Sequence, residues 1–178
     1  MTPYRSPYEA YPFLCDPDAD VRCDFEIMTD AMASRTGLLA AQVPERREEL
    51  LKLDELIYHA NPTLRTFFSV TEPEIAWLAG RVEALRRETD GLCRRFVLPA
   101  GSPRACLAHG LRVDGKALVR LIYRHCQRTG EAHDRLIDFA SLVSEYFFLL
   151  ALWLNRADGV AEIDFESRNY PAPKSREA

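Results

Sequence analysis

The sequence predicts an all-α protein built from five helices, and two observations support that fold class. Apolar residues recur at intervals of three and four in five successive segments, as the buried face of a helix requires. Strands alternating with helices and repeated units are not apparent along the chain. With 178 residues, of which 47% are hydrophobic, we expect one helical bundle domain over residues 24–165.

An irregular arm over residues 1–23 precedes the predicted domain, and a flexible tail over residues 166–178 follows it. The arm is rich in tyrosine, aspartate and proline, and proline disfavours both helix and strand interiors. It also carries several aromatic side chains: Tyr4, Tyr8, Tyr11 and Phe13. We expect the arm to lie along the domain or a neighbouring subunit, and the alternative is a disordered end.

The first two helices are predicted from apolar spacing and from their ends. The first runs from Asp24, its expected cap, to about Gln42. Pro44 opens the second, which extends to about Ala60 and ends at the Asn61–Pro62 step. Its buried stripe is expected to consist of Leu50, Leu53, Leu56 and Ile57.

Two further helices begin with a cap residue followed by proline. Thr71 and Glu74 fit a capping box at the start of the third helix. The inner face of that helix is expected to be Ile75, Leu78, Val82 and Leu85. Ser102 caps the fourth helix, which runs to about Arg128, where Gly130 ends it.

The fifth helix is predicted over residues 131–155. Its segment 146–154 is apolar on all sides, so it is either the central element or a subunit contact. A short extended piece is expected after it, over residues 160–165.

Composition excludes several classes of protein. The net charge of −4 argues against a nucleic-acid-binding domain. We expect no membrane span, because uninterrupted apolar runs stay well short of the roughly 20 residues that a span requires. The N-terminus lacks the apolar core of a secretory signal, and five scattered cysteines without a CxxC pair fit reduced thiols. These features favour a cytoplasmic protein.

The fourth helix carries a ladder of basic residues four apart: Arg112, Lys116, Arg120, Arg124 and Arg128. Each step of four turns about 40° around the helix, so the ladder spirals. Arg112 and Lys116 can share one anionic ligand, Arg120 can assist, and Arg124 and Arg128 are expected to face water. The alternative is a ladder that is entirely solvated.

The sequence shows neither a typical metal-binding motif nor two of the common catalytic motifs. Cys106 and His109 lie three apart and His125 adjoins Cys126, but a second ligand pair at a defined interval is missing, so we expect no metal site. We expect His59 and His133 to have no acidic or nucleophilic partner. The sequence has no GxSxG turn and no GxxxxGK[ST] loop.

The loop before the fourth helix is the remaining candidate. Residues 98–102 read LPAGS and open a helix whose N–H groups and dipole favour an anion. Ser102 is therefore a candidate ligand of a phosphate group. The alternative is an ordinary loop in which Gly101 turns the chain and Ser102 only caps the helix.

Three stretches carry a resemblance to a known family. They are FVLPAGS at 96–102, AHGLR at 108–112, and SEYFF at 144–148 leading to LWLN at 152–155. Together they resemble the ATP:corrinoid adenosyltransferases of the propanediol-utilisation type. That family's pattern reads FxLPGG[ST], then LHxAR, then a C-terminal helix that contains LNRLSDxLF and ends in a short apolar run and Asn. The resemblance covers about residues 72–160.

The resemblance implies a five-helix bundle that assembles as a homotrimer, with ATP and a corrinoid bound at subunit interfaces. It implies transfer of the 5′-deoxyadenosyl group of ATP, with Mg²⁺, to cob(I)alamin, and release of triphosphate. The expected partners are therefore these small molecules.

The resemblance also assigns roles to residues. Phe96 would pack beside the corrin and help remove its lower axial ligand, with core packing as the alternative. Arg112 matches the first arginine of the family's fourth helix, and Lys116 matches the basic residue one turn further on. A lysine there lacks the planar guanidinium group with which arginine binds a phosphate through two hydrogen bonds. Arg120 and Glu145 match its later arginine and the acid that ends LNRLSD.

Three departures from the family leave the activity open. The N-terminal YTxTGDxG loop that wraps the nucleotide has no counterpart, and Ala100 replaces a glycine of LPGG. The aspartate of the first helix falls at Met32, and Asp30 points about 200° away from it. Three hypotheses follow: a divergent adenosyltransferase, a non-catalytic corrinoid-binding or partner-binding relative, and an unrelated helical interaction module.

Overall fold

The computed structural model describes residues 4–93 and 96–169. Within those residues the chain forms five α-helices and one 3-10 turn and has no strand, which confirms the all-α prediction. The helices are α1 (Arg22–Gln42), α2 (Arg47–Ala60), α3 (Glu72–Glu88), α4 (Pro103–Thr129) and α5 (Asp134–Ala157), and the turn η1 (Pro44–Arg46) precedes α2.

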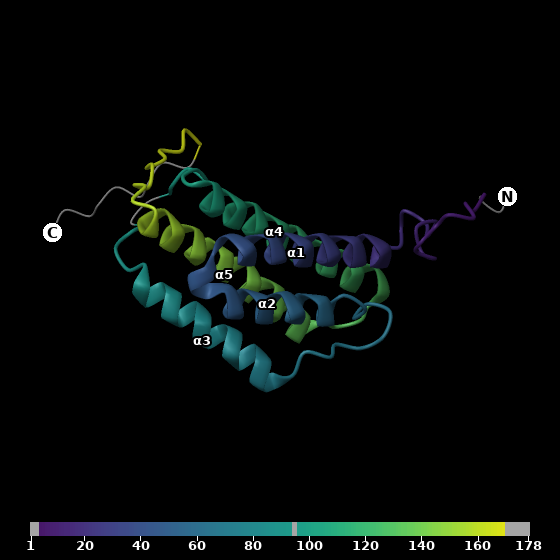
Figure 1. Ribbon diagram of the computed structural model, residues 1–178. Coiled ribbons are helices and arrows are strands. Elements are labelled where there is room, and N and C mark those ends of the chain that lie inside the picture. Colours follow the sequence, from purple (N-terminus) through teal and green to yellow (C-terminus); the bar gives the residue numbers. More distant parts are fainter. Residues whose placement is uncertain (1–3, 94–95, 170–178) are drawn as a thin grey trace.

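The two longest helices, α4 and α5, form an antiparallel hairpin with the most extensive contact in the bundle. α1 packs on α4, α3 packs on α5, and α2 packs on α1 (Figure 1). The loop that leads into α4 lies at the end of the bundle where α5 finishes. The turn between α4 and α5 lies at the opposite end (Figure 1).

Helix α5 forms the centre of the core. Its residues 146–154 are buried on nearly all sides, as predicted, and Tyr146, Phe147 and Leu150 are fully enclosed. By length and composition alone α5 could cross a membrane, so the expectation that the chain has no membrane span stays a prediction. Most of its apolar stretch is buried inside the bundle, as in the core helix of a globular domain.

The starts of three helices differ from prediction. Residues Pro44–Arg46 form the turn η1, so α2 begins at Arg47. Asp24 lies inside the first turn of α1 and does not cap it, because the Asp20 carboxylate accepts the backbone N–H of Arg22 at 3.1 Å and starts the helix earlier. Helix α5 begins at Asp134, since the left-handed Gly130 and the residues after it form the turn. The capping box at Thr71 and the Ser102 cap are confirmed.

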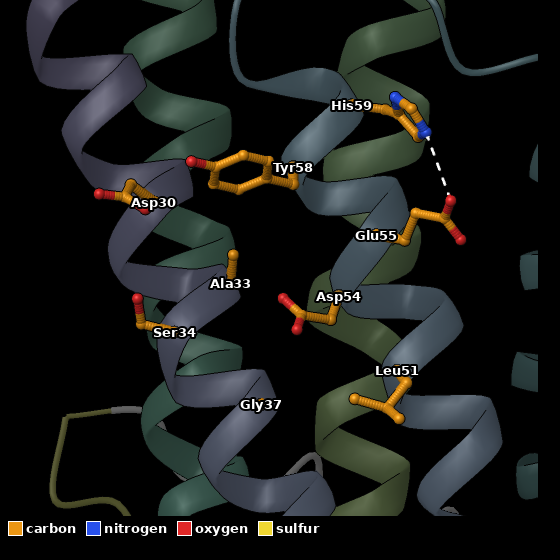
Figure 2. Close-up of a pocket in the computed structure, with 9 residues that line it drawn as sticks. All are labelled: Asp30, Ala33, Ser34, Gly37, Leu51, Asp54, Glu55, Tyr58 and His59. Carbon is orange, nitrogen blue, oxygen red and sulfur yellow. Dashed lines mark ion pairs between the residues drawn. The ribbon is translucent and has the colours of Figure 1, made fainter.

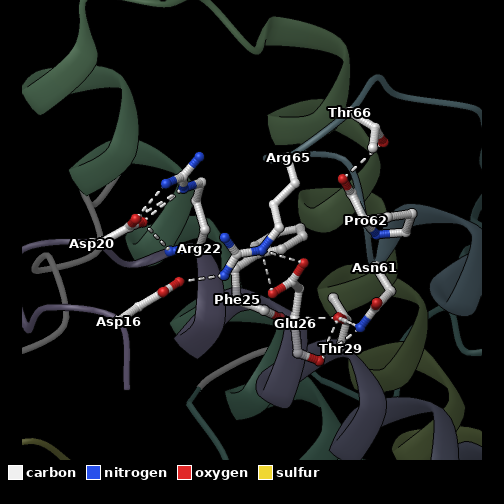
Figure 3. Close-up of polar contacts among 10 residues, drawn as sticks. All are labelled: Asp16, Asp20, Arg22, Phe25, Glu26, Thr29, Asn61, Pro62, Arg65 and Thr66. Carbon is white, nitrogen blue, oxygen red and sulfur yellow. Dashed lines mark hydrogen bonds and ion pairs between the residues drawn. The ribbon is translucent and has the colours of Figure 1, made fainter. Parts of the chain in front are cut away.

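A buried ion-pair cluster anchors the end of the arm to the helices (Figure 3). The Arg65 guanidinium lies 2.8 Å from Glu26 of α1 and 2.6 Å from Asp16 of the arm, and it stacks 3.7 Å over the ring of Phe13. The Glu26 side chain is 6% exposed. Arg65 therefore joins the arm, α1 and the loop after α2, whereas Tyr4 and Tyr8 are exposed.

We predict that Arg65→Ala lowers the free energy of unfolding by about 3 kcal/mol, because it leaves the Glu26 carboxylate buried without its cation. Urea denaturation of the purified protein measures this change. The matched control is Arg47→Ala, at an exposed position of α2, which we expect to alter stability by less than about 0.5 kcal/mol. Equal effects of the two substitutions would contradict the prediction.

Helices α4 and α5 approach most closely at Gly115. A β-carbon added there would lie 2.9 Å from Cβ and 3.1 Å from Cα of Ser144 on α5. The Ser144 hydroxyl donates to the backbone oxygen of Arg112 at 3.0 Å in the same contact. Glycine is therefore required at position 115, whereas a β-carbon at Gly110 would meet nothing within 4 Å.

We predict opposite effects for alanine at these two glycines. Gly115→Ala forces the backbones of α4 and α5 apart and should destabilise the fold by about 1–3 kcal/mol. Gly110→Ala adds a better helix former at an open position and should stabilise it by about 0.5–1 kcal/mol. Thermal unfolding followed by circular dichroism compares the two variants, and a stabilising Gly115→Ala would show the interpretation to be wrong.

Candidate functional site

The loop before α4 is held in shape by one buried amide, Asn155 of α5. Its Oδ1 accepts the backbone N–H of Ser102 at 3.0 Å, and its Nδ2 donates to the backbone oxygen of Ala100 at 3.0 Å. Gly101 has a φ of 135°, and a β-carbon there would lie 1.9 Å from Asn155 Oδ1. The glycine of the LPAGS sequence is therefore required both by its backbone angle and by the space that Asn155 occupies.

Ser102 is a helix cap in this structure. It is buried, and its Oγ accepts the backbone N–H of Ala105 at 3.3 Å. The next residue but one, Arg104, fixes the start of α4 through ion pairs with Asp158 at 2.6 Å and Glu45 at 2.8 Å. The geometry supports the capping alternative for Ser102, and a contact from Ser102 to a ligand stays a prediction.

Phe96 lies on the surface. Its side chain is 71% exposed, so it does not pack in the core of this chain. Residues 96–98 run antiparallel to residues 163–165, with backbone bonds from Leu98 N to Ile163 O at 2.9 Å and from Phe165 N to Phe96 O at 2.7 Å. Side chains alternate along such a ribbon, so Phe96, Leu98, Ile163 and Phe165 share one face. This apolar face is exposed at all four positions.

Arg112 and His109 of α4 form a polar pair against Phe148 of α5. The Arg112 guanidinium carbon lies 5.8 Å from the centre of the Phe148 ring, and the His109 ring lies 6.4 Å from it. Both His109 ring nitrogens and Arg112 Nε are buried without a hydrogen-bond partner among the residues that the structure describes. Buried polar atoms are normally hydrogen-bonded, so these three atoms mark a place that suits a polar ligand.

The rest of the basic ladder extends along the surface of α4. Lys116, Arg120 and Arg124 are exposed and form no ion pair within residues 4–93 and 96–169. Arg128 is also exposed, but it donates to the backbone oxygen of Ala19 in the arm, which corrects the expectation that it only faces water. Arg112, Lys116 and Arg120 thus present positive charge that acidic side chains of the described chain do not neutralise.

The structure does not group the two expected acids with this ladder. The Glu145 carboxylate pairs with Arg86 of α3 at 3.3 Å. Met32, which the resemblance places at the position of an expected aspartate, is fully buried in the core. Asp30 lines a groove between α1 and α2 and so lies apart from the Arg112 surface.

That groove has a volume of about 480 Å³ and is acidic (Figure 2). Asp30, Asp54 and Glu55 line it, and burial raises the pKa of the Asp54 carboxyl. Tyr58 extends across it from α2 toward α1 (Figure 2). Such a surface repels a polyphosphate, so the groove is not a candidate site for an anionic ligand.

Sequence reasoning assigned no role to three residues that shape the site: Asn155, His109 and Phe148. Each of the three lies in one of the stretches that carry the family resemblance. Only the fold shows that Asn155 reaches the LPAGS loop and that Phe148 lies under Arg112. It was wrong that His59 and His133 have no acidic partner. They lie 3.7 Å from Glu55 and 3.4 Å from Glu131.

Burial, and secondarily the positive charge of Arg112, lowers the pKa of His109 to about 4. An unfolded histidine takes up its proton near pH 6.5. The unfolded chain therefore binds more protons between pH 6.5 and pH 4, and stability falls as the pH is lowered through that range.

We predict that His109→Leu removes part of this pH dependence, up to about 1.4 kcal/mol per pH unit. Urea denaturation at several pH values between 4 and 7 measures it. The control His59→Ala, at an exposed histidine, should retain the slope. An unchanged slope in His109→Leu would contradict the assignment.

Comparisons with known proteins agree on one group. No family model matches the sequence. A corrinoid adenosyltransferase of Bacillus subtilis is 28% identical over 104 residues, which is 58% of this chain and 53% of that protein. The chain thus aligns with about half the length of this curated relative.

Solved structures show the same fold. Three variants of a PduO-type ATP:corrinoid adenosyltransferase from Lactobacillus reuteri are 18–20% identical to this chain, with TM-scores of 0.72–0.74. The matches cover 83–90% of this chain and 87–97% of those chains. Two variants, with a phenylalanine changed to alanine or histidine, are complexed with cobalamin and ATP, and the third, an arginine-to-lysine variant, with ATP. The chain therefore has the fold of these enzymes and resembles them in sequence.

Proposed function

We propose that this protein is a divergent ATP:corrinoid adenosyltransferase, with the nucleotide bound on the Arg112 surface of α4 and the corrinoid beside Phe96. The observation that carries the proposal is the group of buried nitrogen atoms of His109 and Arg112 that lack a partner within the described residues, beside cations that form no ion pair there. An anionic ligand with several acceptor oxygens can accept hydrogen bonds from Arg112 Nε and from the N–H of the His109 ring, and it balances the positive charge of that cluster.

The triphosphate of ATP, with Mg²⁺ as its counter-ion, fits this surface. Arg112 rests against Phe148, which limits its freedom, and Lys116 lies one helical turn further on. The phenylalanine and the arginine replaced in the L. reuteri structures are twenty residues apart in that protein, as Phe96 and Lys116 are here. The arginine-to-lysine variant was still obtained with ATP, which supports a lysine at this position as compatible with the nucleotide.

The apolar face around Phe96 suits the flat, largely apolar ring of a corrinoid. Phe96, Leu98, Ile163 and Phe165 lie exposed on one side of a backbone ribbon, where they offer a planar contact surface. In the proposed reaction the electron pair of cobalt(I) attacks C5′ of ATP. The cobalt electron pair forms a cobalt–carbon bond, the C5′–oxygen bond breaks, and triphosphate leaves with the electron pair of the broken bond.

A homotrimer would bring the two surfaces together between chains. α4 rises about 1.5 Å per residue, so Arg112 lies about 15 Å along the helix from the loop that carries Phe96. A second copy placed against this face would cover the exposed apolar residues and enclose the cationic ladder. Light scattering should give about three times the chain mass of 20.3 kDa, and a monomer would contradict the interfacial site.

We predict that millimolar triphosphate raises the melting temperature by about 5 °C, because it binds the folded state at the cationic cluster. Arg112→Ala should abolish that rise. The matched control is Arg124→Ala, three turns along the same helix, which should retain it. A similar rise in both variants would indicate nonspecific attraction to the ladder.

Turnover tests the reaction itself. Cobalamin reduced to the cobalt(I) state, ATP and Mg²⁺ are incubated with the protein, and the visible spectrum follows conversion to adenosylcobalamin. We expect turnover, reduced about 100-fold in kcat/KM by Arg112→Ala, the scale for the loss of one charge-stabilising group. Phe96→Ala should slow turnover and leave the triphosphate-induced melting shift unchanged. A corrinoid spectral change without product would favour the non-catalytic relative instead.

A further inference from the structure

Three potential metal ligands converge at the turn between α4 and α5, at the opposite end of the hairpin from the Phe96 loop. They are His125 in the last turns of α4, and Glu131 and His133 in the connection to α5. The proposed adenosyltransferase site uses none of them.

Local hydrogen bonds fold the connection back over α4. Gly130 adopts a left-handed conformation with a φ of 77° and ends the helix. The Thr129 hydroxyl donates to the backbone oxygen of His125 at 3.0 Å and accepts the backbone N–H of Glu131 at 3.1 Å. The turn therefore directs Glu131 toward the ring of His125, six residues earlier in the chain.

The three donor atoms form a compact set. His125 Nε2 lies 3.2 Å from Glu131 Oε2, and His133 Nε2 lies 3.4 Å from the same oxygen. All three ligand atoms lie within 4.8 Å of one another, and the two imidazole rings are 5.4 Å apart between centres. Two nitrogen donors and one carboxylate oxygen thus surround a single point.

We propose that His125, Glu131 and His133 bind one divalent transition-metal ion of the zinc class. Zinc binds histidine nitrogen and carboxylate oxygen at about 2.0–2.2 Å, so adjacent ligands of a tetrahedral site lie about 3.3 Å apart. The two nitrogen–oxygen distances already match that edge. Calcium and magnesium fit this set poorly, because they bind oxygen donors and two of the three ligands here are imidazole nitrogens.

The three proposed ligands differ in how far their side chains are exposed to solvent. The His125 side chain is 7% exposed and the His133 side chain 18%, whereas Glu131 is 62% exposed on the solvent side. The metal therefore enters past Glu131, and its fourth position faces water. Bound there, it ties the end of α4 to the start of α5 and stabilises the hairpin on which Arg112 and Phe148 lie.

The competing explanation is a hydrogen-bond cluster in which the Glu131 carboxylate accepts an N–H from each imidazole. That cluster needs no metal and predicts no metal affinity. Ligand spacing in the sequence could not separate the two cases, because the three residues meet only through the turn at Gly130.

Isothermal titration of the full chain with Zn²⁺, with Mg²⁺ as the negative control, tests the proposal. We expect one equivalent of Zn²⁺ to bind and to raise the melting temperature. Glu131→Gln and His133→Ala should each weaken binding by about 100-fold or more. Circular dichroism checks their folding, which we expect to be retained because both positions lie in the turn.

Two controls distinguish this site from others on the chain. His59→Ala removes an exposed histidine that also has a glutamate partner, and it should leave Zn²⁺ binding unchanged. Arg112→Ala should also leave it unchanged, which separates this proposal from the adenosyltransferase proposal. The visible spectrum of Co²⁺ bound in place of Zn²⁺ should lack the intense thiolate bands that cysteine ligands produce.

Either of two results would overturn the proposal. One is the absence of saturable Zn²⁺ binding by the full chain in the titration. The other is wild-type affinity in both Glu131→Gln and His133→Ala.

Discussion

The close approach of α4 and α5 at Gly115 determines where the groups of the candidate site lie. Ser144 of α5 fills the space that a side chain at position 115 would occupy, and its hydroxyl bonds the main chain of Arg112. One turn further along α5, Phe148 meets the side chains of Arg112 and His109. Arg112 is thus fixed to α5 through both its backbone and its side chain, so a rigid helix pair presents its charge.

Charge is distributed unevenly over this acidic protein. The net charge is −4, yet Lys116, Arg120 and Arg124 of α4 form no ion pair within the described residues, and carboxylates gather in the groove between α1 and α2. Burial keeps the His109 imidazole neutral near pH 7, so it adds hydrogen-bonding capacity beside Arg112 without adding charge. The molecule therefore attracts anions to one face and repels them from another.

The sequence predicts the five helices well because their signals are local. The Thr71 capping box, the Ser102 cap and the apolar stripe of α2 need only neighbouring residues, and all are present. The start of α5 was misplaced, since Gly130 and Thr129 shape a turn that helix periodicity does not reveal.

The candidate site was less predictable because its contacts join distant segments. Asn155 holds the LPAGS loop across more than fifty residues, and Glu145 pairs with Arg86 from a third helix. The resemblance to adenosyltransferases predicts Phe96 and Arg112 as site residues. The exposure of Phe96, which rules out its packing in the core, became visible only in the fold.

Backbone hydrogen bonds between residues 96–98 and residues 163–165 join the loop before α4 to the segment after α5, so the two segments are coupled. Asn155 reinforces this coupling, because the same amide that holds Ala100 also bonds Glu162 at 3.0 Å. Any movement of Phe96 is therefore transmitted to the C-terminal segment. A fusion partner or label placed directly after residue 165 would alter the Phe96 surface, although it would be attached nearly seventy residues away in the chain.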